Sequence, residues 1–213
     1  MTLDELIGPI HGRLGVLERS GDQRVTIADL TDDSRKVGPG SLFVAVQGER
    51  VDGHQFLDPV VAAGAAAVVV QRSGDVGAIS CVRVQDSRAA LGILGSRFYG
   101  DPSSSLRMIG VTGTNGKTTT TYVVKTMLEA ARRRVGLIGT VAYLVGKESI
   151  PASHTTPGAL ELQKLFARMR EARLDTVVME VSSHALALDR TAGSEFDVAV
   201  FTNLTQDHLD FHL

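Results

Sequence analysis

The sequence has 213 residues, of which 43% are hydrophobic, and this content is sufficient for a buried core and excludes a disordered chain. Its formal net charge of −2 gives no electrostatic reason to expect nucleic acid or an anionic membrane as a partner. Cys81 is the only cysteine, which excludes a disulfide framework and a thiolate zinc site and favours a reducing, cytoplasmic location. The longest apolar run, residues 60–70, is too short to span a bilayer, so we expect no secretion and no membrane insertion.

The first part of the chain alternates between short strand patterns and helical patterns. Apolar, β-branched runs indicate the strands, and Asp52 is a candidate N-cap for the first helical segment. We predict strands at 41–47, 65–70 and 80–85, and helices at 52–65 and 87–100. A loop rich in Gly, Pro and Ser follows at 100–106, and we place a domain boundary there, which gives domains at 1–103 and 104–213.

The second part repeats the pattern of strand, long helix and strand, which is typical of a parallel sheet with helices on its faces. One of its helices carries a single apolar stripe, formed by Leu162, Leu165, Phe166 and Met169. We predict strands at 107–112, 135–140, 175–181 and 197–202, and helices at 117–132 and 158–172. The predicted fold class is therefore α/β, with a small N-terminal α/β domain followed by a parallel-sheet domain of the P-loop type.

The stretch VTGTNGKTTTTYVV, residues 111–124, joins a buried strand to an amphipathic helix through two glycines. Such a turn directs backbone N–H groups and the positive end of the helix dipole at one point, which suits a polyphosphate. Lys117 would supply a cation to the outer phosphates, and Thr118 a hydroxyl at the position where P-loop proteins hold Mg²⁺. Val111 stands where the strict P-loop pattern has glycine, and the alternative is a turn that only permits close packing. We predict nucleotide binding by Gly113, Thr114, Asn115, Gly116, Lys117, Thr118 and Thr119.

Polar residues follow the predicted strand at 175–181, at the carboxyl end where open α/β sheets bind ligands. They are Glu180, Ser182, Ser183 and His184. A carboxylate at Glu180, within an apolar run, requires a partner, which is either a bound cation or an arginine. The sequence therefore makes Glu180 a candidate metal ligand.

Two further segments have a similar arrangement. Asn203, Asp207 and His208 lie past the end of the predicted strand at 197–202. Thr155 and Thr156 precede the predicted helix at 158–172, where they would either contact a ligand or cap the helix.

Four motifs together resemble the Mur ligases, the ATP-dependent amide-forming enzymes of peptidoglycan synthesis. They are TGTNGKTTT, HTTP, MEVSSHALAL and FTNLTQDHLDFH, in that order along the chain. The stretch TDDSRKVGPGSLFVAVQGERVDGHQF, residues 31–56, is similar to the uridine-nucleotide-binding domain of the same family. The resemblance covers the chain from about residue 25 onward, and MEVSSHALAL resembles the members that add a diamino acid.

The resemblance implies a role for each matching residue. It implies an ATP loop at 113–119, Mg²⁺ contacts at Thr118, Glu180 and His208, and catalytic roles for Lys117, Glu180 and His208. Asp32 and Ser34 would contact the UDP-sugar, and residues 49–51 would do so as well. The residues that would hold the sugar-peptide are Thr155, Thr156, Ser182 and Arg190. His154 departs from the asparagine that the family has before TTP.

The implied reaction has two substrates besides ATP, a UDP-MurNAc-dipeptide and an amino acid. ATP phosphorylates the terminal carboxylate of UDP-MurNAc-L-Ala-D-Glu, and the amine of meso-diaminopimelate or L-lysine then displaces phosphate. Two anions must meet in the first step, so Lys117 and Mg²⁺ would offset their repulsion, and Arg190 would clamp the substrate.

Two alternatives remain open at this point. One is another Mur-type ligase such as MurF, and the other is a non-catalytic module that binds a UDP-sugar or a nucleotide. The family pattern continues beyond DHLDFH with the rest of the ATPase sheet and a C-terminal domain. We therefore expect this chain to be a partial polypeptide, incomplete at the C-terminus, that binds ligands and does not complete ligation by itself.

Overall fold

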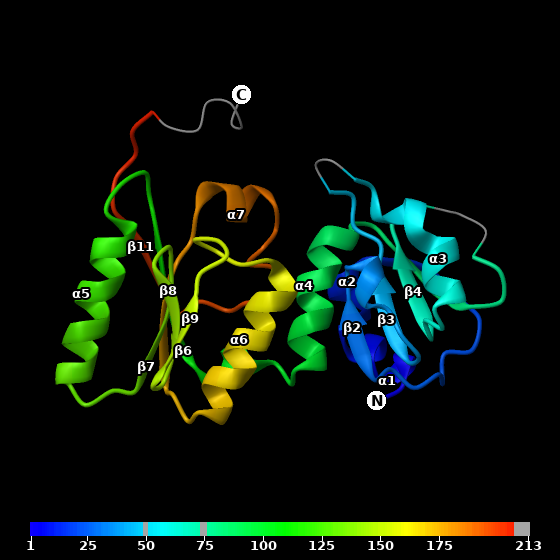
Figure 1. The fold of residues 1–213 in the computed structure, drawn as a ribbon, viewed down its shortest axis with the longest axis horizontal. Coiled ribbons are helices and arrows are strands. Elements are labelled where there is room, and N and C mark those ends of the chain that lie inside the picture. The colour runs from blue at the N-terminus through cyan, green and yellow to red at the C-terminus, as the bar shows by residue number, and fades with distance from the viewer. Residues whose placement is uncertain (49–50, 73–75, 207–213) are drawn as a thin grey trace. The chain divides into compact units, whose positions relative to one another are not determined.

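The computed structural model describes residues 1–48, 51–72 and 76–206. The chain folds into two compact units, Met1–Phe98 and Tyr99–Leu213. Each unit contains one sheet with helices (Figure 1), so the predicted α/β fold class is confirmed. The separate functions predicted for domains 1–103 and 104–213 stay predictions. None of the helices in the described part of the chain has both the length and the apolar character that a membrane span requires.

The sheet of the first unit has the strand order β1-β5-β4-β3-β2. Its strands are parallel except for β1, which is antiparallel to β5. The predicted strands at 41–47, 65–70 and 80–85 are present with shorter bounds, and β1 and β2 are additional. The strands are β1 (Val16–Ser20), β2 (Asp29–Thr31), β3 (Ser41–Val44), β4 (Ala67–Val70) and β5 (Ser80–Val84).

The helices of this unit are short except for the last one. They are α1 (Leu3–Ile7), α2 (His11–Leu14), α3 (Leu57–Ala62) and α4 (Ser87–Phe98), with 3-10 turns η1 (Gly8–Ile10), η2 (Ser34–Lys36) and η3 (Gly53–Phe56). The single helix predicted at 52–65 was wrong, because that segment divides into η3 and α3. Asp52 caps the 3-10 turn, and the ring of Pro59 would clash with the carbonyl of Gln55 in a continuous α-helix.

The sheet of the second unit has the order β11-β6-β10-β7-β8-β9. Its first four strands in this order are parallel, and β8 and β9 add an antiparallel hairpin that the sequence pattern did not predict. The strands are β6 (Arg107–Thr112), β7 (Val135–Ile138), β8 (Ala142–Val145), β9 (Glu148–Pro151), β10 (Thr176–Glu180) and β11 (Val198–Phe201). The helical elements are η4 (Pro102–Ser105), α5 (Lys117–Ala130), α6 (Ala159–Glu171) and α7 (Ser183–Ala187).

Helices α5 and α6 cover opposite faces of this sheet (Figure 1). Val177 of β10 packs in the cluster that contains the α6 residues, whereas its neighbour Val178 packs in the cluster that contacts α5. The predicted apolar stripe of α6 is confirmed, since all four of its residues are buried in the first of these clusters. Because β6, β7, β10 and β11 are parallel, their carboxyl ends lie along one edge of the sheet, and the segments that follow them build the candidate site.

Candidate functional site

A loop of four residues, 113–116, connects β6 to α5. Both of its glycines have positive φ angles, +129° at Gly113 and +85° at Gly116, the N-cap of α5. A Cβ atom at Gly113 would lie 2.2 Å from Oγ1 of Thr202, so only glycine fits this close approach. The first turn of α5 begins directly after the loop, and its backbone N–H groups have no acceptor within the helix. The loop therefore has the geometry of an anion site at a helix N-terminus.

Lys117, the first residue of α5, is held against this loop. Its Nζ donates hydrogen bonds to the carbonyl oxygens of Gly113 at 2.6 Å and Thr114 at 2.9 Å. These two bonds fix a positive charge beside the backbone that the sequence predicted to bind phosphate. Thr118 and Thr119 follow in the same helical turn.

Glu180, the last residue of β10, is almost completely buried beside Thr118. Its Oε2 accepts hydrogen bonds from Oγ1 of Thr118 at 2.9 Å and from Oγ1 of Thr140 at 3.1 Å, and its Oε1 accepts one from the Thr140 N–H at 3.0 Å. Within the described residues the carboxylate is thus bonded to two threonines, and the alternative of an arginine partner is not found there. Thr140 was not among the predicted residues, although it follows the end of β7 at the same edge of the sheet.

Gly139 makes the position of this carboxylate possible. A Cβ atom at Gly139 would lie 2.3 Å from Oε1 of Glu180, which is well inside van der Waals contact. The sequence LIGT at the end of β7 therefore supplies both the space and the donors for Glu180.

The oxygen atoms around Glu180 are the kind that Mg²⁺ binds. Mg²⁺ is held in proteins by one or two carboxylates together with hydroxyl, water and phosphate oxygens, and Glu180 and Thr118 supply a carboxylate and a hydroxyl. The described ranges contain no group of three or more His, Cys, Asp or Glu side chains that could hold a metal by itself. His208, the third predicted ligand, lies outside the described residues, as does Asp207.

Thr155 and Thr156 lie beside Glu180. The N-cap residue of α6 is Gly158, so the alternative that these threonines cap the helix was wrong. Oγ1 of Thr155 lies 3.0 Å from Oγ1 of Thr140 in a hydrogen bond. Thr156 is fully buried; its Oγ1 donates to the Glu180 carbonyl at 2.9 Å and accepts from the Ser182 N–H at 3.0 Å. Its hydroxyl therefore bonds two backbone groups at the end of β10 and positions that segment.

Ser182 and Arg190 lie on either side of α7. Ser182 is the N-cap of this helix, and its Oγ accepts a hydrogen bond from the Ala185 N–H at 3.1 Å. Nη1 of Arg190 donates to the carbonyl of Thr156 at 3.0 Å. The hydroxyl of Tyr143, a residue not predicted from the sequence, donates to the carbonyl of His154 at 2.7 Å and accepts from the His154 N–H at 3.1 Å. Thr156 thus connects the predicted substrate residues Ser182 and Arg190, while Tyr143 holds the backbone just before Thr155.

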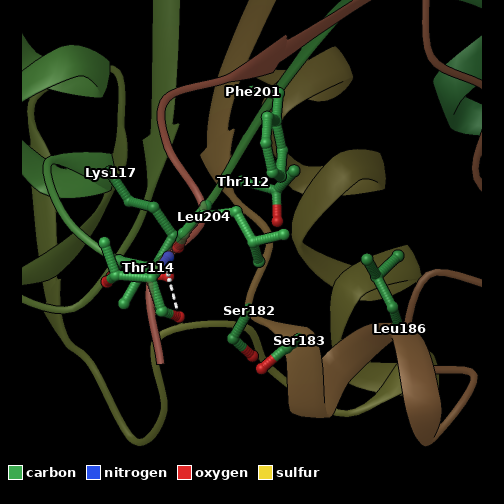
Figure 2. A pocket seen from close by; sticks show the side chains of 10 residues that line it. Thr112, Thr114, Lys117, Ser182, Ser183, Leu186, Phe201 and Leu204 are labelled. Carbon is green, nitrogen blue, oxygen red and sulfur yellow. Dashed lines mark hydrogen bonds between the residues drawn. The ribbon is translucent and has the colours of Figure 1, made fainter. Parts of the chain in front are cut away.

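A cavity of about 380 Å³ opens beside the phosphate loop (Figure 2). Figure 2 shows Lys117 and Thr114 on one side of it, and Ser182, Ser183 and Leu186 on another. Its apolar wall includes Leu186, Phe201 and Leu204, which are largely exposed in the described structure. The full lining is Thr112, Gly113, Thr114, Lys117, Ser182, Ser183, Leu186, Phe201, Leu204 and Thr205. The cavity therefore combines a cationic loop with apolar surface, as a nucleotide or a charged substrate requires.

The first unit contains a separate cavity of about 670 Å³. Its lining includes Asp32 and Ser34, the two residues predicted to contact a UDP-sugar, and the cations Arg35 and Lys36. Asp33 accepts hydrogen bonds from Nε of Arg35 at 2.8 Å and from Nη2 at 2.9 Å, and the Arg35 guanidinium lowers the pKa of Asp33 to about 2. The cavity is thus bordered by charged groups of both signs at neutral pH. Of the predicted contacts at 49–51, only Val51 lies in the described residues, and it lines this cavity.

A parallel sheet with a glycine loop between strand and helix, a lysine at the helix start and a carboxylate at the neighbouring strand end is characteristic of α/β proteins of the P-loop type. Two protein-family models match the sequence. "Mur ligase family, catalytic domain" matches residues 26–99, and "Mur ligase middle domain" matches residues 111–213. The chain belongs to the Mur ligase family.

Similar curated proteins carry the name UDP-N-acetylmuramoyl-L-alanyl-D-glutamate--2,6-diaminopimelate ligase. The protein of Alkaliphilus metalliredigens is 49% identical over 200 residues, which are 93% of this chain and 40% of that protein. The protein of Geobacillus thermodenitrificans is 49% identical over 212 residues, which are 100% of this chain and 42% of that protein. The chain thus spans about two fifths of the length of the curated relatives it matches.

Solved structures show the same similarity. The structure of a UDP-N-acetylmuramoyl-L-alanyl-D-glutamate--2,6-diaminopimelate ligase matches with a TM-score of 0.81 at 27% identity, over 98% of this chain and 41% of that chain. MurF from Acinetobacter baumannii matches with a TM-score of 0.65 at 25% identity, over 98% of this chain and 42% of that chain. MurF from Thermotoga maritima, in complex with ADP, matches with a TM-score of 0.59 at 26% identity, over 88% of this chain and 39% of that chain.

Proposed function

We propose that this chain supplies the UDP-sugar-binding and ATP-binding units of a ligase that adds a diamino acid to UDP-MurNAc-L-Ala-D-Glu in peptidoglycan synthesis. The observation that carries the proposal is the 2.9 Å hydrogen bond between Thr118 and Glu180, which joins the phosphate loop to a buried carboxylate 62 residues away in sequence. A packing turn alone would not require a buried carboxylate beside the loop. The similarity to diaminopimelate ligases over nearly the whole chain supports the same reaction.

In the proposed site, the loop at 113–119 binds the phosphates of ATP. The backbone N–H groups at the start of α5 donate to phosphate oxygens, and Lys117, held at the loop, adds a positive charge. Glu180, Thr118 and, outside the described residues, His208 are the proposed Mg²⁺ contacts. When bound, Mg²⁺ neutralises phosphate charge and polarises the transferred phosphoryl group. The ADP complex reported for the MurF of Thermotoga maritima is consistent with a nucleotide here.

The chemistry begins with a poor electrophile, the terminal carboxylate of the dipeptide. One of its oxygens attacks the γ-phosphorus of ATP, the bond to the β-phosphate oxygen breaks, and ADP leaves, which gives an acyl phosphate. The neutral amine of the incoming amino acid then attacks the acyl carbon, phosphate leaves with the bonding electron pair, and the nitrogen releases one proton to solvent. Lys117 offsets the repulsion between carboxylate and triphosphate in the first step, since its ammonium lies at the loop.

The residues that we propose as contacts of the sugar-peptide lie in both units. We assign the UDP group to the cavity bordered by Asp32, Ser34 and Arg35, where the cation can pair with the diphosphate. Ser182, Thr155 and Arg190 are the proposed contacts for the reacting end of the peptide. Thr156 supports them from a buried position instead of contacting the substrate.

The names of the similar proteins favour 2,6-diaminopimelate over L-lysine as the amino acid. The higher TM-score against the diaminopimelate ligase than against MurF favours this reaction over that of the sister ligase. The cytoplasmic location of the reaction, where its nucleotide substrates occur, stays a prediction.

Isothermal titration calorimetry of the 213-residue chain tests the proposal. We expect separate binding of UDP-MurNAc-L-Ala-D-Glu and of MgADP. Lys117→Ala should weaken MgADP binding at least tenfold and leave the UDP-substrate unaffected, whereas Arg35→Ala should have the opposite selectivity. Each variant is thereby the control for the other. Failure of the wild-type chain to bind either ligand, or the same loss of both ligands in each variant, contradicts the proposal.

A further inference from the structure

The backbone that leaves β11, residues 202–205, is bonded to the phosphate loop. The Thr114 N–H donates to the carbonyl of Asn203 at 3.0 Å, and Oγ1 of Thr202 donates to the carbonyl of Asn115 at 2.7 Å. Thr114 and Thr205 are joined in both directions: Oγ1 of Thr114 donates to the Thr205 carbonyl at 3.1 Å and accepts from the Thr205 N–H at 2.9 Å. The phosphate loop and residues 202–205 are thus joined by several hydrogen bonds between residues that lie 87 to 91 positions apart in the sequence.

Asn203 makes the most specific of these contacts. Its Oδ1 accepts a hydrogen bond from the Asn115 N–H at 3.0 Å, and its Nδ2 donates to the Asn115 carbonyl at 3.1 Å. The side-chain amide of Asn203 therefore bonds both the N–H and the carbonyl of the Asn115 backbone, as a neighbouring β-strand would. Aspartate has nearly the same shape, but it cannot donate to the carbonyl, so the arrangement requires asparagine.

These contacts determine which N–H groups of the loop remain for a ligand. The N–H groups of Thr114 and Asn115 donate hydrogen bonds to Asn203, in the segment of residues 202–205 that we call the exit segment. The N–H groups of the first turn of α5, in contrast, have no acceptor within the helix. Gly113 allows the exit segment to lie this close, since a Cβ there would also lie 2.8 Å from the carbonyl oxygen of Asn203. Fixing the loop before the nucleotide arrives lowers the entropy that binding must otherwise remove.

We propose that Asn203 is a positioning residue for the nucleotide, which holds the phosphate loop in its binding conformation through the backbone of Asn115. The inference rests on the proposed function, because it assigns a role within the same ATP site. Asn203 acts through Asn115 and does not itself contact the phosphates.

Asn203→Asp is the informative variant, because it retains the acceptor for the Asn115 N–H and replaces the donor with an oxygen that faces the Asn115 carbonyl. We expect MgADP affinity to fall about tenfold, as for the loss of one well-placed hydrogen bond. The melting temperature and the affinity for UDP-MurNAc-L-Ala-D-Glu should stay close to wild type, which a general loss of folding would not permit. Gln206→Ala, at the exposed position that follows residues 202–205, is the control and should bind MgADP like the wild type.

Wild-type affinity for MgADP in Asn203→Asp, while the wild-type chain binds MgADP, would overturn the inference and leave the proposed function intact. Failure of the wild-type chain to bind MgADP would overturn the proposed function and the inference with it. Amide hydrogen exchange of the wild-type chain gives a second test that needs no variant. We expect the Asn115 amide to exchange more slowly than an unstructured amide without nucleotide, and exchange at the unstructured rate would overturn the inference.

Discussion

Replacement of Gly139 by alanine should move the Glu180 carboxylate without changing any group that binds a ligand. The new Cβ would lie 2.3 Å from Oε1, 3.1 Å from Cδ and 3.3 Å from Cγ of Glu180. Ordinary contact requires about 3.4 Å or more, so the carboxylate must move by roughly 1 Å. The backbone of Gly139 does not have a positive φ angle, so the substitution acts through this contact alone.

The magnitude follows from the bonds that such a movement breaks. Oε1 accepts from the Thr140 N–H at 3.0 Å, and a displacement of this size takes it out of hydrogen-bond range. Loss of one hydrogen bond to a buried charged group costs about 1.5–3 kcal/mol, and overpacking costs about 1–3 kcal/mol. We therefore expect the free energy of unfolding to fall by about 2–4 kcal/mol, because relaxation relieves part of the strain.

Urea unfolding and calorimetry with MgADP measure the two consequences. We expect the free energy of unfolding of Gly139→Ala to fall by the amount estimated from these contacts. We also expect its affinity for ADP in the presence of Mg²⁺ to fall at least tenfold. Gly38→Ala is the control, since a Cβ there meets nothing within 4 Å, no positive φ angle requires glycine, and the residue belongs to the first unit. A Gly139→Ala chain with the stability and Mg²⁺ dependence of wild type would show that Glu180 is not confined as described, and would refute the reasoning.

Three further outcomes can be measured by urea unfolding. Phe166→Ala removes a fully buried ring from the core beneath α6 and should cost about 3–5 kcal/mol, and a loss below about 1 kcal/mol would contradict this packing. Thr156→Val leaves the Ser182 N–H and the Glu180 carbonyl without their partner and should cost about 1–3 kcal/mol; wild-type stability would contradict the bridging role. For Asp33, the folded pKa of about 2 lies below the usual value near 4, so its stabilising effect is present at neutral pH and is lost as the pH falls toward 2. Asp33→Asn should therefore be slightly less stable than wild type at pH 6, with the difference shrinking toward pH 3, and a difference that grows toward pH 3 would contradict the sign.

Periodicity predicted the elements whose burial is regular. The strand at 107–112 has the predicted bounds, and the α6 stripe packs as expected, because both contain uninterrupted apolar patterns. The hairpin of β8 and β9 was missed because β9 is mostly exposed and polar, so its pairing depends on the neighbouring strand and not on its own pattern.

The candidate site was predictable only in part. The rule that ligands bind at the carboxyl ends of parallel strands predicts that Glu180 and the loop at 113–119 lie near each other, and they are in contact through Thr118. The same rule places Gly139 and Thr140 at this edge, after β7, but it does not show that they contact Glu180. That contact depends on the register between β7 and β10, which the sequence does not give. Likewise, a buried hydroxyl at Thr156 looks like a helix cap or a ligand contact until its backbone partners are known.

We propose that the phosphate loop and Glu180 together bind a magnesium nucleotide. The most direct test is calorimetric titration of ADP, with and without Mg²⁺, into the wild-type chain and into Glu180→Gln. Glutamine can still accept from the Thr140 N–H and donate to the two threonine hydroxyls, so we expect its stability to change by no more than about 1 kcal/mol. We expect Mg²⁺ to strengthen ADP binding in the wild type and to have little effect in the variant. The same Mg²⁺ effect in both chains, or no ADP binding by the wild type, would contradict it.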